Sequence, residues 1–167
     1  MKKIIASILG LGISSSCFAI DTTNFNTYIG FGLGETNLAT STDSENNNLD
    51  LYLLKIGRDF RDLFTGEITF SNDGEREELM PHVYYNRPLS LNLTSAIGAG
   101  LGLLHNENPS EYRVGYDFSF RLKYRIQPEV NIFSGYQWMD AINGSNIGIP
   151  SNGHINQFIF GLDYYFR

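Results

Sequence analysis

Hydrophobic and polar residues alternate with a period of two along most of this chain. The last segment is the clearest, because Phe158, Phe160, Leu162, Tyr164 and Phe166 share one parity and the residues between them are mostly small or polar. A period of two places successive side chains on opposite faces of a β-strand. The segment is therefore predicted to be a strand with one continuous apolar face.

The segment from Arg113 to Arg125 shows the same alternation over an unusual length. Strands of globular proteins usually have about 5–6 residues, whereas tilted transmembrane strands need about 9–11. Its length favours a membrane-spanning strand. The outward parity is predicted to hold Val114, Tyr116, Phe118, Phe120, Leu122 and Tyr124.

Weaker alternation in the remaining segments brings the predicted strands to eight. In the second strand we favour an outward-facing Tyr52, Leu54 and Ile56, with Lys55 inward. In the fourth, Pro81 would have to lie near a strand end, because proline cannot donate to the ladder. The predicted strands cover residues 25–35, 49–58, 64–70, 79–86, 93–103, 113–125, 130–138 and 157–166.

The links between these strands are predicted to alternate in length. Residues 36–48, 71–78, 104–111 and 139–153 form longer links than 59–63, 87–92 and 127–129. Short periplasmic turns and longer external loops are typical of outer-membrane barrels. The prediction is an all-β fold, an eight-stranded antiparallel up-and-down transmembrane β-barrel with both termini periplasmic. The alternative is a soluble lipocalin-like barrel, in which Arg121 and Lys123 would lie outside.

The N-terminal residues predict export. Lys2 and Lys3 precede an apolar run from Ile4 to Ile13, which is shorter than the roughly 20 residues of a membrane-spanning helix. Cys17-Phe18-Ala19 is a small-x-small sequence typical of signal-peptide cleavage. We predict a cleaved signal peptide at 1–19 and an outer-membrane barrel domain at 20–167; an anchor helix and a lipoprotein acylated at Cys17 are the alternatives.

Composition narrows the possible partners. The 167-residue chain has a net charge of −6, which argues against nucleic acid as a partner. Its mean hydropathy of −0.19 does not separate a soluble protein from a membrane barrel, because lumen-facing residues dilute the lipid-facing ones. The one cysteine lies in the predicted signal peptide, and nothing in the sequence indicates a metal or another cofactor.

Four segments together resemble the small outer-membrane β-barrel superfamily, which includes the membrane domain of outer membrane protein A and adhesin-like eight-stranded barrels. They are Tyr28–Gly34, Lys55–Phe60, Ile97–Gly102 and Gly161–Phe166. The resemblance implies an outer-membrane location, contact with membrane lipid and lipopolysaccharide, and insertion by the barrel-assembly machinery. It also implies that the closing segment, with Gly161, Tyr164 and Phe166, serves as the assembly signal.

The inward parity is rich in charge. An eight-stranded barrel is just wide enough for side chains to fill, and buried charges persist when they are paired. We therefore predict a salt-bridged plug, in which Glu67 meets Arg121 or Lys123; glycines of the first and fifth strands would leave room for the long side chains. A conducting pore is the alternative. The predicted lumen charge network is Lys55, Glu67, Asp117, Arg121, Lys123, Arg125 and Asp163.

Three functional classes follow. The leading one is a non-enzymatic structural or surface-interaction (adhesin-like) protein, with a possible host or surface ligand at the external loops. A narrow channel for small solutes is the second. The third is a lipid A-modifying hydrolase or acyltransferase, for which Ser151, His154 and Asp140 are the best available trio. The outward acidic residues of the loops are predicted to be Glu35, Asp43, Glu45, Asp73, Glu75, Glu77, Glu78, Glu107, Glu111 and Asp140.

Overall fold

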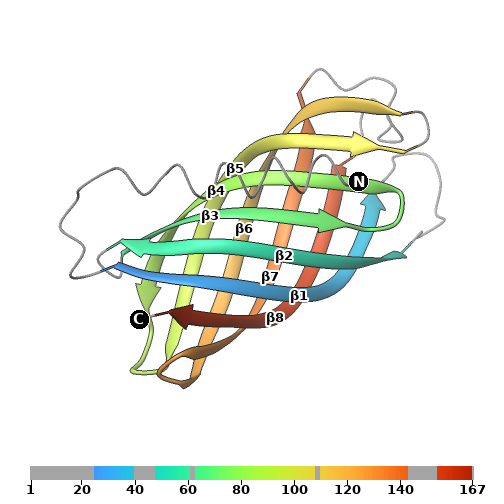
Figure 1. The fold of residues 1–167 in the computed structure, drawn as a ribbon. Helices are drawn as coiled ribbons and strands as arrows, with labels where there is room; N and C mark the ends of the chain where they lie inside the picture. Colours follow the sequence, from blue (N-terminus) through green and yellow to red (C-terminus); the bar gives the residue numbers. More distant parts are fainter. Residues whose placement is uncertain (1–24, 40–47, 61–62, 108–109, 143–153, 167) are drawn as a thin grey trace.

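The computed structural model describes residues 25–39, 48–60, 63–107, 110–142 and 154–166, and the predicted signal peptide lies outside them. These residues form eight strands (Figure 1). None of the described residues belongs to a helix that is long and apolar enough to cross a membrane. The strands are β1 (Phe25–Ala39), β2 (Asn48–Phe60), β3 (Phe64–Asn72), β4 (Arg76–Pro88), β5 (Leu93–Asn106), β6 (Glu111–Gln127), β7 (Val130–Ala141) and β8 (His154–Phe166).

The strands close into one antiparallel barrel, as predicted. Each strand pairs with its neighbour in the sequence, and β8 returns to pair with β1 from Thr27–Phe166 to Ala39–His154. Closure leaves no free sheet edge, so the backbone hydrogen bonds are made between strands. We call the end at which β1 begins and β8 finishes the termini end, and the opposite end the loop end (Figure 1).

The link between β3 and β4 is much shorter than predicted. The residues expected to form a loop at 71–78 instead continue both strands, and only Asp73–Glu75 separate them. Asp73 Oδ1 accepts hydrogen bonds from the backbone N–H groups of Glu75 (3.1 Å) and Arg76 (2.8 Å). Gly74 has a φ of 87°, which glycine adopts readily. A tight turn at this position therefore replaces the expected external loop.

Pro81 lies in the middle of β4 rather than near its end, so that prediction was wrong. The β4–β5 pairing includes Leu79–Leu103 and His82–Gly100 but is interrupted at the two positions between them. Proline has no N–H and cannot donate across a ladder. The strand continues because its other edge is intact, with Pro81 paired to Ile68 of β3.

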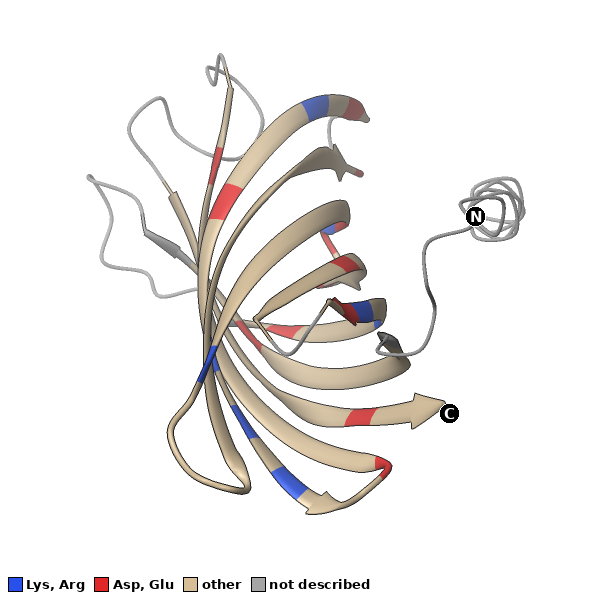
Figure 2. Ribbon diagram, turned by 90° about the vertical axis from the view of Figure 1, so that its left-hand side faces the viewer, with Lys and Arg blue, Asp and Glu red and all other residues tan. Residues whose placement is uncertain are grey.

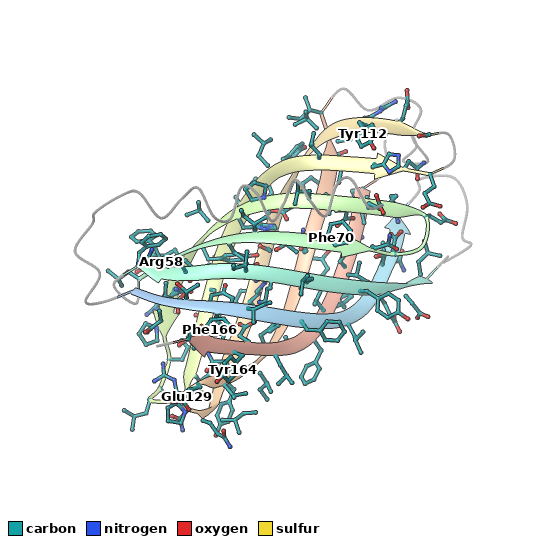
Figure 3. All side chains as sticks on the ribbon, viewed as in Figure 1. Arg58, Phe70, Tyr112, Glu129, Tyr164 and Phe166 are labelled. Atoms are coloured by element: carbon teal, nitrogen blue, oxygen red, sulfur yellow. The ribbon has the colours of Figure 1, made fainter. Side chains whose placement is uncertain are left out.

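The outer wall of the barrel is apolar along its whole circumference. The predicted outward parities are confirmed for β2, β6 and β8, where residues such as Leu54, Phe118 and Phe160 are more than half exposed. In Figure 3, the labelled outer-wall side chains Tyr164 and Phe166 lie near the termini end. Most of the ribbon between the two ends carries neither kind of charge (Figure 2).

Aromatic residues gather at both ends of this wall. The termini end carries Phe60, Phe64, Tyr85, Tyr124, Tyr164 and Phe166, and the loop end carries Tyr52, Tyr112, Tyr116 and Trp138. Aliphatic residues such as Ile68, Val83 and Leu101 lie between them and are exposed, together with phenylalanines such as Phe31 and Phe160. An apolar band between two aromatic girdles matches a lipid bilayer and its interfaces. Arg121 and Lys123 are buried inside, which excludes the lipocalin-like alternative.

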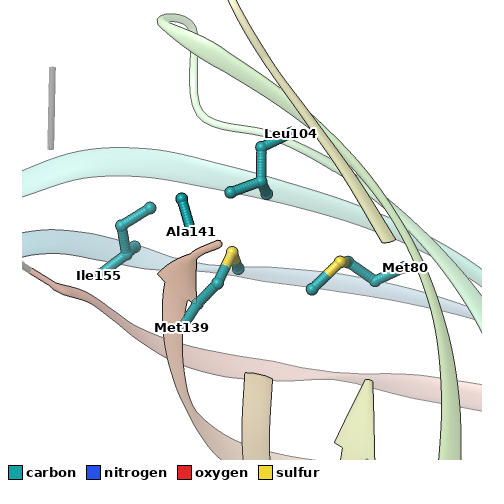
Figure 4. Packing of buried hydrophobic residues seen from close by; sticks show 5 residues of the cluster. All are labelled: Met80, Leu104, Met139, Ala141 and Ile155. Carbon is teal, nitrogen blue, oxygen red and sulfur yellow. The ribbon is translucent and has the colours of Figure 1, made fainter. Parts of the chain in front are cut away.

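Two apolar clusters fill part of the lumen. Near the loop end, Met80, Leu104, Met139, Ala141 and Ile155 pack together from β4, β5, β7 and β8 (Figure 4). A second cluster lies further toward the middle and consists of Leu51, Leu53, Phe133 and Ile159. The barrel therefore has apolar side chains packed inside as well as outside. The Glu67 carboxylate and its partners lie on the termini side of the Met80 cluster, whereas Glu78 lies on its loop side.

Glycines make space for large lumen side chains, as predicted for the first strand. A Cβ on Gly30 would lie 2.3 Å from Asp163 Oδ1 and 2.4 Å from Lys55 Cε. The expectation for the fifth strand was only partly right. A Cβ on Gly98 would meet the Tyr84 ring, and one on Gly100 would meet His82 and Asp117, so these positions make room for rings and a carboxylate rather than for Arg or Lys.

Replacing Gly30 with alanine is expected to destabilise the barrel by about 1–3 kcal/mol, the usual cost of overpacking. The added methyl group would force Lys55 away from Asp163 in a closed interior. Gly66→Ala is the matched control, because its Cβ would meet only the movable ring of Phe60, at 3.2 Å. Urea unfolding from phospholipid vesicles measures both. Equal midpoints for the two variants would contradict the tight packing at Gly30.

Candidate functional site

Glu67 of β3 is the centre of the polar section of the lumen. Its side chain is fully buried, and Arg121 of β6 donates from Nη1 to both carboxylate oxygens, at 2.6 and 2.8 Å. Tyr28 Oη donates to Oε2 (2.5 Å) and Thr69 Oγ1 to Oε1 (2.9 Å). Alternation in β1, β3 and β6 turns all four side chains inward. The stagger in register between neighbouring strands brings the four side chains to the same level along the barrel axis.

Lys55 of β2 joins a second carboxylate to this centre. Its Nζ lies 3.4 Å from Glu67 Oε2 and 3.0 Å from Asp163 Oδ1 of β8. The same ammonium group is 3.5 Å from the centroid of the Phe133 ring. The Arg121 guanidinium carbon is 4.4 Å from the centroid of the Tyr84 ring. Two cations and two carboxylates therefore neutralise each other inside the barrel, between aromatic faces.

Asp117 of β6 belongs to a neighbouring pair rather than to the Glu67 centre. His82 Nε2 lies 2.5 Å from Asp117 Oδ2, and the Gln137 amide also donates to this oxygen. His82 Nδ1 is 3.3 Å from Thr69 Oγ1, which connects the pair to Glu67. Five of the seven predicted charges thus belong to one group that ion pairs and hydrogen bonds connect, and four neutral or neutral-capable side chains, Tyr28, Thr69, His82 and Gln137, complete it.

Glu78 and Asp73 do not face outward as predicted. Glu78 is buried in the lumen, where Ser71 donates to it at 2.5 Å and Gln157 at 2.9 Å. Asp73 is buried against Arg76, whose Nη2 lies 2.6 Å from its Oδ2. Because β3 and β4 extend beyond the expected link, alternation turns Glu78 inward.

The remaining two predicted network residues lie on the termini side. Of the two predicted partners of Glu67, Arg121 forms the ion pair and Lys123 does not; the second cation at Glu67 is Lys55. Lys123 is buried, and its Nζ lies 5.4 Å from the centroid of the Tyr28 ring. Arg125 faces the lumen as predicted, but it is exposed at the mouth and lies outside the Glu67 centre. Both border a polar cavity of about 360 Å³ at the termini end.

Several members of this site were not among the predicted residues. They are Tyr28, Thr69, His82, Tyr84 and Gln137, which are all buried in the lumen. Each of them is separated by an even number of positions from other inward-facing residues of its strand. The alternation of the sequence could therefore have predicted that they face the lumen. The predicted assembly-signal residues lie apart from the site. Tyr164 and Phe166 are exposed on the outer wall, and Gly161 is buried where a Cβ would meet the Phe133 ring.

The candidate catalytic trio is not assembled in the part of the chain that the structure describes. Ser151 lies outside the described residues. The His154 ring packs on Trp138 at 5.8 Å between centroids, whereas Asp140 accepts from the Ala141 backbone and from Tyr116. The Asp117–His82–Thr69 chain has the residue types of a hydrolytic triad, but the Thr69 hydroxyl donates to Glu67 and the chain is buried.

Acidic side chains surround the loop end. Glu35, Asp50, Glu75, Glu107 and Glu111 are exposed there. The nearby cations are already engaged, since Arg76 binds Asp73 and Arg113 Nη2 lies 3.2 Å from Glu111 Oε2. Among the described residues, this rim is therefore net negative.

Neither a family model nor a curated protein matches the sequence, but solved structures match its fold. Neisserial surface protein A is 13% identical, with a TM-score of 0.64 over 84% of this chain and 97% of that one. Outer membrane protein H (OprH) of P. aeruginosa is 20% identical, with a TM-score of 0.58 over 84% and 99%. Ail of Yersinia pestis, solved with the heparin analogue sucrose octasulfate, is 11% identical, with a TM-score of 0.54 over 85% and 99%. The chain has the fold of the small eight-stranded outer-membrane β-barrels.

Proposed function

We propose that this chain is an integral outer-membrane protein of the structural or surface-interaction type, with a lumen that a side-chain plug closes to ions. The observation that carries the proposal is the Glu67 centre, in which Arg121, Lys55 and Tyr28 contact one buried carboxylate. The apolar cluster around Met80 and Met139 supports closure on the loop side. A barrel whose interior is occupied acts through its surfaces.

The loop end is the surface we propose for interaction. Its exposed carboxylates would repel a polyanion and attract a basic or cation-bridged partner. Ail was solved with a sulfated heparin analogue, and the acidic rim of this chain favours the opposite charge in a ligand. We propose no enzymatic role, because the described histidine–carboxylate pair of the lumen is buried and its neighbouring hydroxyl is engaged. The outer wall contacts membrane lipid and lipopolysaccharide, and the assembly machinery recognises Gly161, Tyr164 and Phe166.

Planar bilayers containing the folded protein are expected to show no stepwise conductance at any applied voltage. The proposed plug would leave no continuous water path, because the buried charges of the Glu67 centre are paired and separating them is costly. Insertion is checked separately by the heat-dependent gel mobility of protein recovered from the same vesicles. Reproducible current steps that increase in number with the amount of inserted protein would contradict the plug and favour the narrow channel.

A further inference from the structure

The termini end of the lumen holds a polar cavity that the Glu67 centre does not use. It has a volume of about 360 Å³, within the range of small-ligand sites. Its lining comes from both sides of the barrel and includes Asn26 of β1, Thr94 of β5 and Asn131 of β7. Such groups donate and accept hydrogen bonds, and the long side chains of Lys123 and Arg125 add two positive charges.

Lys123 is the unusual member of this lining. Only 4% of its surface is exposed. The carboxylates closest to the centre are already paired, Glu67 with Arg121 and Lys55, and Asp163 with Lys55 at 3.0 Å. Within the described residues, no carboxylate lies within ion-pair distance of the Lys123 ammonium group. The centroid of the Tyr28 ring is 5.4 Å away, and Asp163 attracts the ammonium group from beyond ion-pair distance. A buried cation without an ion pair is costly, and an anion in the cavity would relieve that cost.

The one carboxylate of the cavity wall is engaged elsewhere. Asp59 accepts a 2.5 Å hydrogen bond from Thr65 Oγ1 and another from the Tyr165 hydroxyl, which also bonds to Asn131. Arg125 at the mouth is exposed and has no ion pair among the described residues. The cavity therefore presents two cations to a ligand against one carboxylate that already has two hydroxyl donors.

From this arrangement we infer that the cavity binds a small oxyanion, a phosphate or carboxylate group, between Lys123 and Arg125. Cations of this type and amide donors recognise such groups through charge-assisted hydrogen bonds. Lys123 contacts the anion from inside the lumen and Arg125 from the mouth. The site goes beyond the proposed function, since it lies on the opposite end of the barrel from the acidic rim.

Titration of the full barrel with inorganic phosphate tests the site, in nonionic detergent that contains no phosphate. Saturable binding is expected in calorimetry or in backbone amide shifts around Thr94 and Asn131. Lys123→Gln should weaken it about tenfold or more, and Arg125→Gln several-fold, as removal of a charge-assisted contact predicts. Arg87→Gln is the matched control, because Arg87 is exposed at the same end but does not line the cavity.

The outcomes separate clearly. The exposed position of Arg125 keeps the test valid if Lys123→Gln does not fold. Absence of saturable binding, or equal weakening by Arg87→Gln and Arg125→Gln, would overturn the site. A parallel titration in nanodiscs with and without phosphatidylglycerol identifies the source: competition between that lipid and free phosphate supports a headgroup as ligand, and its absence supports a soluble anion. The phosphate titration and the conductance measurement test different parts of the lumen. Absence of phosphate binding would therefore contradict the anion site alone, and stepwise conductance would contradict the plug alone.

Discussion

Glu67→Ala is expected to destabilise the folded barrel by about 3–5 kcal/mol, the usual result of removing one partner of a buried ion pair. The change removes the only carboxylate that Arg121 contacts among the described residues, and it leaves Lys55 with Asp163 alone. The hydroxyls of Tyr28 and Thr69 lose their acceptor as well. Urea unfolding from vesicles, followed by heat-dependent gel mobility, measures the loss.

The matched control is Glu75→Ala in the β3–β4 turn. Glu75 is exposed, and among the described residues its hydrogen bonds to neighbours are made by its backbone N–H and carbonyl groups. Surface substitutions of this kind usually change stability by less than about 0.5 kcal/mol. Glu67→Gln separates charge from shape, because it keeps the size of the side chain and removes the negative charge beside Arg121.

The double variant tests whether the charges are coupled. Glu67→Ala with Arg121→Ala removes both partners, so no unpaired guanidinium remains beside the Tyr84 ring. The loss in unfolding free energy is expected to be smaller than the sum of the two single losses. Strict additivity would show that the lumen is wet enough to screen the pair, and it would argue against the plug.

Alternation predicted which way most side chains point but not which ones meet. Lys55, Glu67 and Arg121 could be placed inside because a period of two is a local property of each strand. Glu67 and Arg121 are 54 positions apart and on strands that do not pair, so their contact depends on the stagger of the closed barrel. A single sequence does not state that stagger, which is why the choice between Arg121 and Lys123 stayed open.

The structure differs from the sequence-based predictions mainly at strand ends and at Pro81. Charged residues near a link are usually solvent-exposed, but Glu78 lies inside the lumen, where Ser71 and Gln157 donate hydrogen bonds to its carboxylate. Pro81 was expected near an end because it weakens a ladder, yet here the neighbouring pairs on both sides hold the strand in register. In both cases pairing with neighbouring strands of the closed barrel outweighs a local property of the residue, the charge of Glu78 or the missing N–H of Pro81.

Leu101→Arg, in the middle of β5, is expected to destabilise the barrel in a lipid bilayer by about 2–4 kcal/mol. Leu101 is 57% exposed on the outer wall, between the aromatic girdles, so the arginine would enter hydrocarbon. Charge on the lipid face of a barrel costs this much near the midplane and little near the interfaces. Equilibrium unfolding from phospholipid vesicles measures the difference from the unmodified protein.

Leu91→Arg makes the same chemical change outside the apolar wall. Leu91 lies in the link between β4 and β5 and is 97% exposed, so its replacement is expected to change stability by less than about 1 kcal/mol. In a folded protein surrounded by water, both arginines would be solvated and the two variants would unfold alike. A selective loss for Leu101→Arg therefore requires hydrocarbon at the centre of the wall, and equal unfolding midpoints would contradict the bilayer-spanning assignment of β5.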